Sequence, residues 1–182
     1  MKLKNSITII IGTLSSLVLL SACLKDTPYM DVSNTAPIVQ FGLSIANGQA
    51  GPFQFAGDTA GYTVNVYDTA IAIDLSSPQV LNDTITVGFQ IDPTQITAFN
   101  GANGTNFVVM PAAYYTLTDT SVQILPGHRV AAIPVTFNIN AMPGTHNYAF
   151  PLTITSVVDK QNPNNQIIIS GNSNQFMWLF SR

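Results

Sequence analysis

Hydrophobic and polar residues alternate along three long runs of the chain, at residues 84–91, 133–139 and 148–155. In each run every second residue is Ile, Val, Leu, Phe or Tyr, and the residues between them are polar or small. A period of two places successive side chains on opposite faces of an extended backbone. Each run therefore predicts a β-strand with one buried face.

Shorter runs of β-favouring residues predict further strands, at residues 38–45, 62–66, 71–75, 115–117, 122–125, 167–170 and 175–180. The pair Pro126-Gly127 follows one of these runs and precedes residues 130–139, which predicts a hairpin between the two strands.

One short helix is predicted at residues 93–100. Pro93 suits the start of a helix, and Asn100-Gly101 suits its end. Scarce Glu, Lys and Arg together with abundant Thr, Asn and Gly favour strands and turns elsewhere. About eight to ten short strands with turns between them predict an all-β domain, an antiparallel β-sandwich over residues 37–182.

The N-terminal residues 1–22 differ from the rest of the chain. Two lysines precede an apolar stretch at residues 7–20, which is shorter than the ~20 apolar residues that a membrane-spanning helix needs, so it indicates a secretion signal. The stretch ends in Leu20-Ser21-Ala22-Cys23, which resembles the lipobox of lipoprotein signal peptides. The resemblance implies that Cys23 receives a lipid and that residues 23–36 form a lipidated, polar tether. An ordinary signal peptide with a chance cysteine is the alternative.

Composition and charge exclude several kinds of partner. The chain has six Lys and Arg residues against nine acidic residues, so it offers no clustered basic face for nucleic acid. Cys23 is the sole cysteine, and once alkylated it supplies neither a disulfide nor a thiolate. His128 and His146 each follow a turn and share no metal-ligand spacing, so we expect no metal and no cofactor.

No set of residues in the sequence predicts a catalytic site. Glycoside hydrolysis uses two carboxyl groups placed on either side of the scissile bond. Asp83, Asp92, Asp119 and Asp159 instead fall in predicted turns and loops, where Asp commonly binds nearby backbone groups. The pattern therefore favours a protein that is not an enzyme.

Five short motifs carry a resemblance to a known family, in the order Phe99-Asn100, Met110-Pro111, Tyr114-Tyr115, Pro126-Gly127 and Tyr148-Ala149-Phe150-Pro151. Together they resemble the immunoglobulin-like domain of unknown function that often opens surface lipoproteins of the Bacteroidota. The resemblance implies an immunoglobulin-like sandwich and a lipid-anchored place in the outer membrane, at the cell surface. It also implies polysaccharide and outer-membrane transport proteins as partners.

Aromatic residues are the predicted ligand contacts, because a sugar ring has an apolar face that lies well against an aromatic ring. Strand parity points Tyr114 and Tyr67 outward, which makes Tyr114 the first choice and Tyr67 the second. Trp178 comes third, since its neighbours are apolar on both sides and favour a place in the core. Ordinary exposed strand tyrosines are the alternative for the first two.

Three threonines follow an Asp and precede a small or apolar residue, as in the O-glycosylation acceptor motif of the Bacteroidota. They are Thr59, Thr69 and Thr84. This resemblance predicts glycosylation at one or more of them, although such a short motif also recurs by chance.

Two function classes follow, with an enzyme disfavoured by the missing catalytic set. The first is a non-enzymatic glycan-binding or accessory lipoprotein of a nutrient-uptake system. The alternative is a structural or adhesive subunit of the fimbrillin type. Maturation of that type needs an early arginine, and no arginine precedes Arg129.

Overall fold

The computed structural model of the protein describes residues 33–42, 53–58, 66–143 and 146–181. Residues 1–22, Cys23 and Thr59 lie outside the described residues, as does most of the strand predicted at residues 62–66. None of the helices in the described segments has the length and apolar character needed to cross a membrane. Residues 35–182 form one compact unit.

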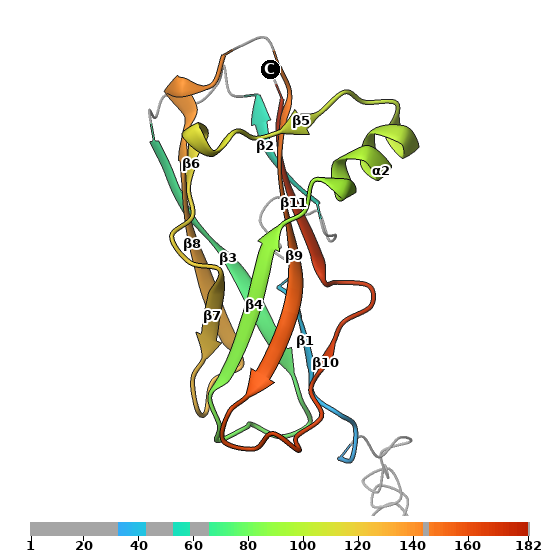
Figure 1. The fold of residues 1–182 in the computed structure, drawn as a ribbon, viewed down its shortest axis with the longest axis vertical. Coiled ribbons are helices and arrows are strands. Elements are labelled where there is room, and N and C mark those ends of the chain that lie inside the picture. Colours follow the sequence, from blue (N-terminus) through green and yellow to red (C-terminus); the bar gives the residue numbers. More distant parts are fainter. Residues whose placement is uncertain (1–32, 43–52, 59–65, 144–145, 182) are drawn as a thin grey trace, which may run out of the picture. The chain divides into compact units, whose positions relative to one another are not determined.

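Two sheets face each other (Figure 1). The first has the order β10 (Ile168–Ile169), β1 (Ile38–Phe41), β3 (Val66–Ser76), β8 (Val130–Asn138) and β6 (Tyr115–Thr116). The second has the order β2 (Phe53–Asp58), β11 (Gln175–Ser181), β9 (Tyr148–Asp159), β4 (Ile85–Ile91) and β7 (Ser121–Ile124), and β5 (Val108–Val109) pairs with β9. The helical elements are α2 (Thr94–Asn103), η3 (Ala112–Tyr114) and η4 (Ile139–Ala141).

The predicted β-sandwich is confirmed, and the three alternating runs form its strands β4, β8 and β9. In β8 the side chains of Ile133, Val135 and Phe137 are buried, while Pro134 and Asn138 between and beside them are exposed. The alternation arises because only one face of the strand meets the opposite sheet.

Aromatic rings fill the centre of the core. The ring of Phe137 lies 5.2 Å from that of Phe150, 5.6 Å from that of Trp178 and 4.8 Å from that of Phe180. Phe137 comes from the first sheet and the other three rings come from the second. Tilted and edge-on ring pairs of this kind join the two sheets by more than apolar burial alone.

The predicted hairpin at Pro126-Gly127 is wrong. β7 pairs with β4 in the second sheet, whereas β8 pairs with β3 and β6 in the first. The turn therefore carries the chain across the core from one sheet to the other. Gly127 has a φ of 79°, a left-handed conformation that glycine adopts without steric cost.

Three pairings differ from the predicted antiparallel arrangement. The long strands pair antiparallel, but β1 with β10, β2 with β11 and β5 with β9 run parallel. Two of these pairs include a strand of only two residues, β10 or β5. The strands β2 and β5 were not predicted from the sequence.

The predicted helix is confirmed as α2, but it is longer than expected. It starts at Thr94 after Pro93 and passes Asn100-Gly101 to end at Asn103. Gly104, with a φ of 64°, forms the left-handed cap and its N–H donates to the carbonyl of Asn100. The stop signal is therefore the second glycine, because a left-handed residue ends a helix whereas a glycine in helical conformation only weakens it.

Candidate functional site

Of the three predicted ligand aromatics, Trp178 belongs to the core and the two tyrosines pack against it. Trp178 is 6% exposed and contacts several core rings, in agreement with the favoured interpretation. The prediction that Tyr67 points outward is wrong: it is half-buried opposite Phe137, and its ring lies 5.8 Å from that of Trp178. The side chain that points outward is its neighbour Val66, which is 49% exposed. The long pairing of β3 with β8 sets this parity, placing Tyr67 on the same face as Ile71.

Tyr114 occupies a separate position at the end of η3. It is half-buried, and its ring meets the buried ring of Tyr148 edge-on at 5.5 Å. The structure therefore packs the half-buried Tyr67 against the buried Trp178, and Tyr114 against the buried Tyr148.

The described acceptor threonines lie in different surroundings. Thr69 is half-buried in β3, in register with the buried Val135. Thr84 lies just before β4, and its backbone N–H donates to the side chain of Gln161 at 3.2 Å. Glycosylation at either position stays a prediction.

Asp159 shapes the loop that follows β9, as expected for an Asp that binds a turn. It is 5% exposed, and its Oδ1 accepts hydrogen bonds from the backbone N–H groups of Gln161 and Asn162. Its Oδ2 accepts one from the side chain of Asn165. The Asp159 carboxylate therefore stabilises this loop through both of its oxygens.

A different part of the molecule carries a hollow. Helix α2 lies across the outer face of the second sheet, over β11 and β9 (Figure 1). A small second core holds it there, made by Ile96, Phe107, Ala149, Met177 and Leu179 with Phe99 packed against them. The second sheet is thus buried on both faces at this point, which explains why apolar residues are continuous from Phe176 to Phe180.

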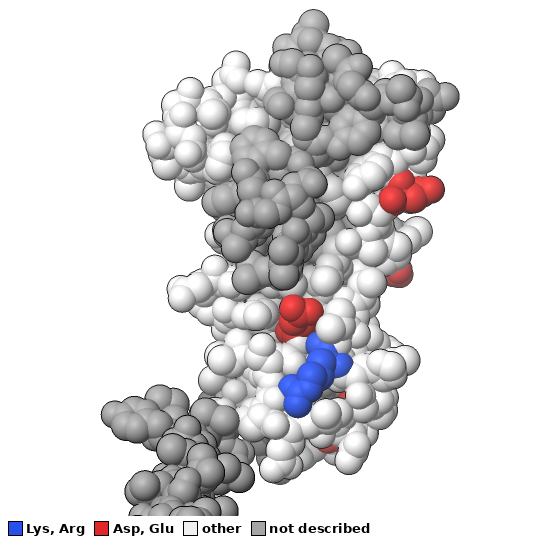
Figure 2. Space-filling model, turned by 180° about the vertical axis from the view of Figure 1, so that it is seen from behind, with Lys and Arg blue, Asp and Glu red and all other residues white. Residues whose placement is uncertain are grey.

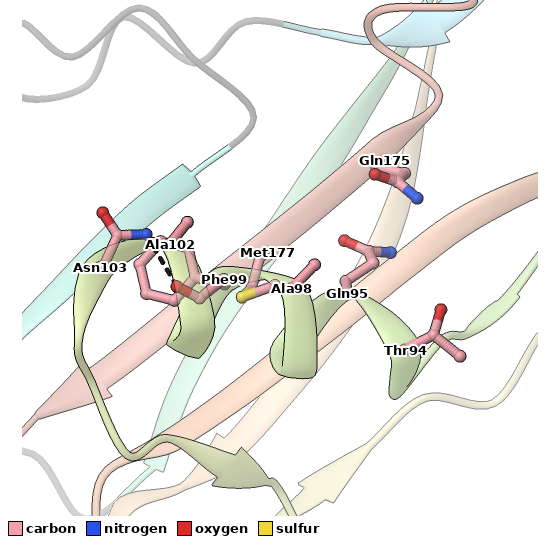
Figure 3. Close-up of a pocket in the computed structure, with 8 residues that line it drawn as sticks. All are labelled: Thr94, Gln95, Ala98, Phe99, Ala102, Asn103, Gln175 and Met177. Atoms are coloured by element: carbon pink, nitrogen blue, oxygen red, sulfur yellow. Dashed lines mark hydrogen bonds between the residues drawn. The ribbon is translucent and has the colours of Figure 1, made fainter.

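The hollow opens between α2 and β11 and has a volume of about 410 Å³. Eight residues line it: Thr94, Gln95, Ala98, Phe99, Ala102, Asn103, Gln175 and Met177. Figure 3 shows Phe99 and Met177 near the middle of the lining, with Asn103 toward one end and Gln95 and Gln175 toward the other. None of these eight side chains is ionisable.

A hydrogen-bond network fixes one end of the helix to the sheet. The buried amide of Gln95 donates from Nε2 to the carbonyl of Leu152 and to the hydroxyl of Thr153, both at 2.8 Å. The Thr153 hydroxyl in turn donates to Oδ2 of Asp92 at 2.8 Å. This network makes the helix a rigid wall of the hollow.

Asp92 ends the network. Its Oδ1 accepts hydrogen bonds from the hydroxyl and the backbone N–H of Thr94, at 2.6 and 3.1 Å. The hydroxyl bond from Thr94 is the largest of several causes that hold the pKa of Asp92 below its ordinary value. At neutral pH the carboxylate is ionised, and it accepts a hydrogen bond from the backbone N–H of Thr94, the first residue of α2.

Gln175 offers the hollow's most available polar group. It is exposed, and its side-chain amide bonds to none of the residues that the structure describes. In Asn103 the Nδ2 donates to the carbonyl of Phe99 at 2.9 Å, which leaves Oδ1 as an acceptor for a ligand. An amide provides both donors and an acceptor, which suits hydroxyl groups.

The spacing of the lining residues in the sequence is consistent with this hollow, although strand parity alone did not predict it. Its helical lining recurs every three or four residues along residues 95–102, and the β11 lining alternates from Gln175 to Met177. Each pattern is short, and only the fold brings them face to face.

Metal and charge chemistry are sparse across the described segments. These segments contain no cluster of three or more His, Cys, Asp or Glu side chains that could hold a metal ion. His128 and His146 are both exposed. Figure 2 shows one face of the molecule, on which most of the described atoms belong to uncharged residues.

Comparison with known proteins relates this chain to a described family. Residues 33–161 match the model of a family described as an N-terminal domain. The chain belongs to this N-terminal domain family. Among curated proteins, none matches the chain.

Several solved structures from Bacteroides have the same fold as this chain. A candidate carbohydrate binding protein from Bacteroides ovatus has a TM-score of 0.54 at 18% identity, covering 79% of this chain and 36% of that chain. A two domain protein of unknown function from Bacteroides fragilis has a TM-score of 0.56 at 9% identity, covering 80% and 45%. EndoBT-3987 of Bacteroides thetaiotaomicron, with a Man5GlcNAc product, has a TM-score of 0.55 at 14% identity, covering 79% and 30%. The chain thus spans less than half the length of these three structures.

Proposed function

We propose that the protein is a non-enzymatic glycan-binding or accessory module of a nutrient-uptake system, anchored through Cys23 in the outer membrane and exposed at the cell surface. The observation that carries the glycan-binding part is the hollow between α2 and β11. Its lining combines amide groups with an aromatic ring and a thioether, without any ionisable side chain.

This chemistry suits a neutral sugar. Hydroxyl groups pair with amides such as Gln175, while the apolar face of a sugar ring can cover the exposed part of Phe99. A sugar carboxylate or sulfate would lose water here without gaining a cationic partner from the lining. The volume of about 410 Å³ lies within the range of about 300–1,000 Å³ that is typical of small-molecule sites.

The descriptions of two fold neighbours support the same class of ligand. One is described as a candidate carbohydrate binding protein, and another is bound to a Man5GlcNAc product. The expected affinity is modest, because one stacked ring and a few hydrogen bonds give ~4–6 kcal/mol, a dissociation constant from about millimolar to tens of micromolar. Many anchored copies on one polymer would then provide retention.

Affinity electrophoresis of residues 24–182 in gels that contain neutral or anionic polysaccharides tests the proposal. We expect retardation by at least one neutral polymer, and loss of that retardation in Gln175→Ala and in Ala98→Leu, which fills the hollow. Ala132→Leu is the matched control, since Ala132 is exposed on β8 in the other sheet. Absence of retardation on every neutral polymer would contradict the proposal and favour the adhesive, fimbrillin-like alternative.

The membrane anchor has its own test. Cys23→Ala should abolish incorporation of labelled lipid and release the protein from the membrane fraction. Membrane attachment that survives this substitution would contradict the lipobox interpretation, whatever the result of the polysaccharide gels.

A further inference from the structure

Exposed aliphatic residues gather at one end of the domain. The described part of the chain has nine large hydrophobic residues with substantial exposure. Six of them lie at the end where β1 begins: Ile38, Val80, Leu125, Val130, Val158 and Ile168. Their exposed fractions run from 37% for Ile38 to 55% for Val130. We call this region the tether end.

Strand register and hydrogen bonds tie these residues to the same end. Ile38 is in register with Ile168 on one side and with Ser76, the last residue of β3, on the other. The start of β8 lies beside the end of β3, because Val130 is in register with Asp74.

The loops of this end are joined in the same way. The N–H of Gly127 donates to the carbonyl of Leu81 at 2.9 Å, linking the β7–β8 turn to the loop before β4. The N–H of Thr84 donates to the side chain of Gln161, linking that loop to the one after β9. The strand ends and loops that carry these apolar side chains are therefore joined at one end of the domain, with Val130 on the outer face of one sheet and Val158 on that of the other.

Charge at the tether end also differs from the rest of the domain. Arg129 and Lys160, the Lys and Arg residues within the described segments, both lie here. Of the nearby acidic residues, Asp159 is buried and bound to its loop, while Asp74 and Asp83 are partly buried. Lys160 is exposed, whereas Arg129 is partly buried and its guanidinium donates to the carbonyl of Ser77. Lys160 is therefore the freer of the two cations.

The lipid anchor of the proposed function reaches the domain at this same end. Residues 24–34 join Cys23 to the compact unit, and at ~3.3–3.6 Å per extended residue they span at most about 40 Å. The last strand, β11, finishes at the opposite end, where Phe180 is in register with Tyr148. Helix α2 also lies in the half away from the tether end, after the far end of β4 (Figure 1).

We propose that the tether end of the domain rests on the bilayer surface. The exposed aliphatic side chains of this end enter the headgroup region, and the exposed Lys160 meets lipid phosphate groups. Each contact is weak alone, but the anchor holds the end at high local concentration next to the lipid, so weak contacts suffice to orient the domain. The hollow beside α2 then lies on the side of the domain, in the half away from the membrane, where polymers in the medium can reach it.

Depth-dependent quenching on vesicles tests this orientation. Residues 24–182 carry no cysteine, so an N-terminal hexahistidine tag on nickel-chelating lipid can replace the natural anchor and a single introduced cysteine can carry an environment-sensitive NBD label. The label is placed at Leu125→Cys on the tether end or at Val108→Cys on the opposite end, where exposure is 39%. The vesicles contain phosphatidylethanolamine, phosphatidylglycerol and nitroxide-labelled lipid.

We expect several-fold stronger quenching at position 125 than at position 108, and a loss of that difference when Val80→Ser and Val130→Ser are added. Val66→Ser, an exposed valine at the other end, should leave the difference unchanged. Equal quenching at both positions, or stronger quenching at position 108, would overturn the proposal. The measurement needs neither a glycan nor modification of Cys23, so its failure is distinguishable from failure of the proposed function.

Discussion

A buried and an exposed valine in the same pair of strands provide a sharp test of the fold. Val87 on β4 is fully buried and lies in register with Val157 on β9. One residue further along β9, Val158 is 47% exposed. Substituting each by Asp makes the same chemical change on opposite faces of one sheet.

The size of the effect at Val87 follows from three terms. Loss of a buried valine removes about 1.5–3 kcal/mol. Keeping the new carboxyl protonated at neutral pH costs about 4 kcal/mol, from an ordinary pKa of about 3.9 and about 1.36 kcal/mol per unit. Burying that neutral carboxyl without a partner adds about 1–3 kcal/mol. The total of about 6–10 kcal/mol approaches the whole stability of a typical domain, about 5–15 kcal/mol.

Urea unfolding followed by fluorescence measures both variants, since Trp178 is the single tryptophan of the chain and is buried in the core. We expect Val87→Asp to be largely unfolded without urea at neutral pH and Val158→Asp to stay within about 0.5–1 kcal/mol of the parent. A buried carboxyl has a raised pKa when folded, so Val87→Asp should regain stability as the pH falls toward about 4.

Equal destabilisation by the two substitutions would refute the assignment of inner and outer faces. Thr86, the immediate neighbour of Val87, is a poorer control than Val158. Parity places it on the outer face, but it is half-buried and its Oγ1 is enclosed without a hydrogen-bond partner among the described residues.

Two further changes test the supports of the α2 region. Asn100→Ala should cost about 1–3 kcal/mol in urea unfolding, because Asn100 bonds to the N–H and carbonyl of Phe107 and to the hydroxyl of Thr105, and unchanged stability would show these bonds to be dispensable. The pKa of Asp92 is lowered from 3.8, so its stabilising effect is complete above that value and is lost as the pH falls below it. Unfolding curves measured from about pH 5 to about pH 3 should therefore show a steeper loss for the parent than for Asp92→Asn, and parallel losses would contradict this role.

The long strands could be predicted because their periodicity extends over many residues. In β9 the alternation from Tyr148 to Ile154 identifies the core face, but the register shifts opposite Gly88 and Phe89. After this irregularity Val157 and Asp159 face inward instead. The local sequence does not predict such a change of face, because the change depends on the register with the partner strand.

Short segments were harder to interpret because their partners are distant in the sequence. Val66 and Tyr67 could each point inward by local parity, and the pairing of β3 with β8 decides between them. The turn at Gly127 was recognisable, yet whether it joins strands of one sheet or of two depends on the position of β4. The hollow likewise needs α2 and β11, which are separated by some 70 residues of chain.

The location of the glycan site can be measured most directly by NMR titration of the side-chain amides. Residues 24–182 labelled with ¹⁵N would be titrated with a neutral oligosaccharide taken from whichever polymer retards the protein most. The account predicts progressive shifts of the side-chain NH₂ signals of Gln175 and Asn103, while that of the exposed Gln123 on β7 stays fixed. Shifts confined to residues outside the hollow, or no shifts at saturating oligosaccharide, would contradict it.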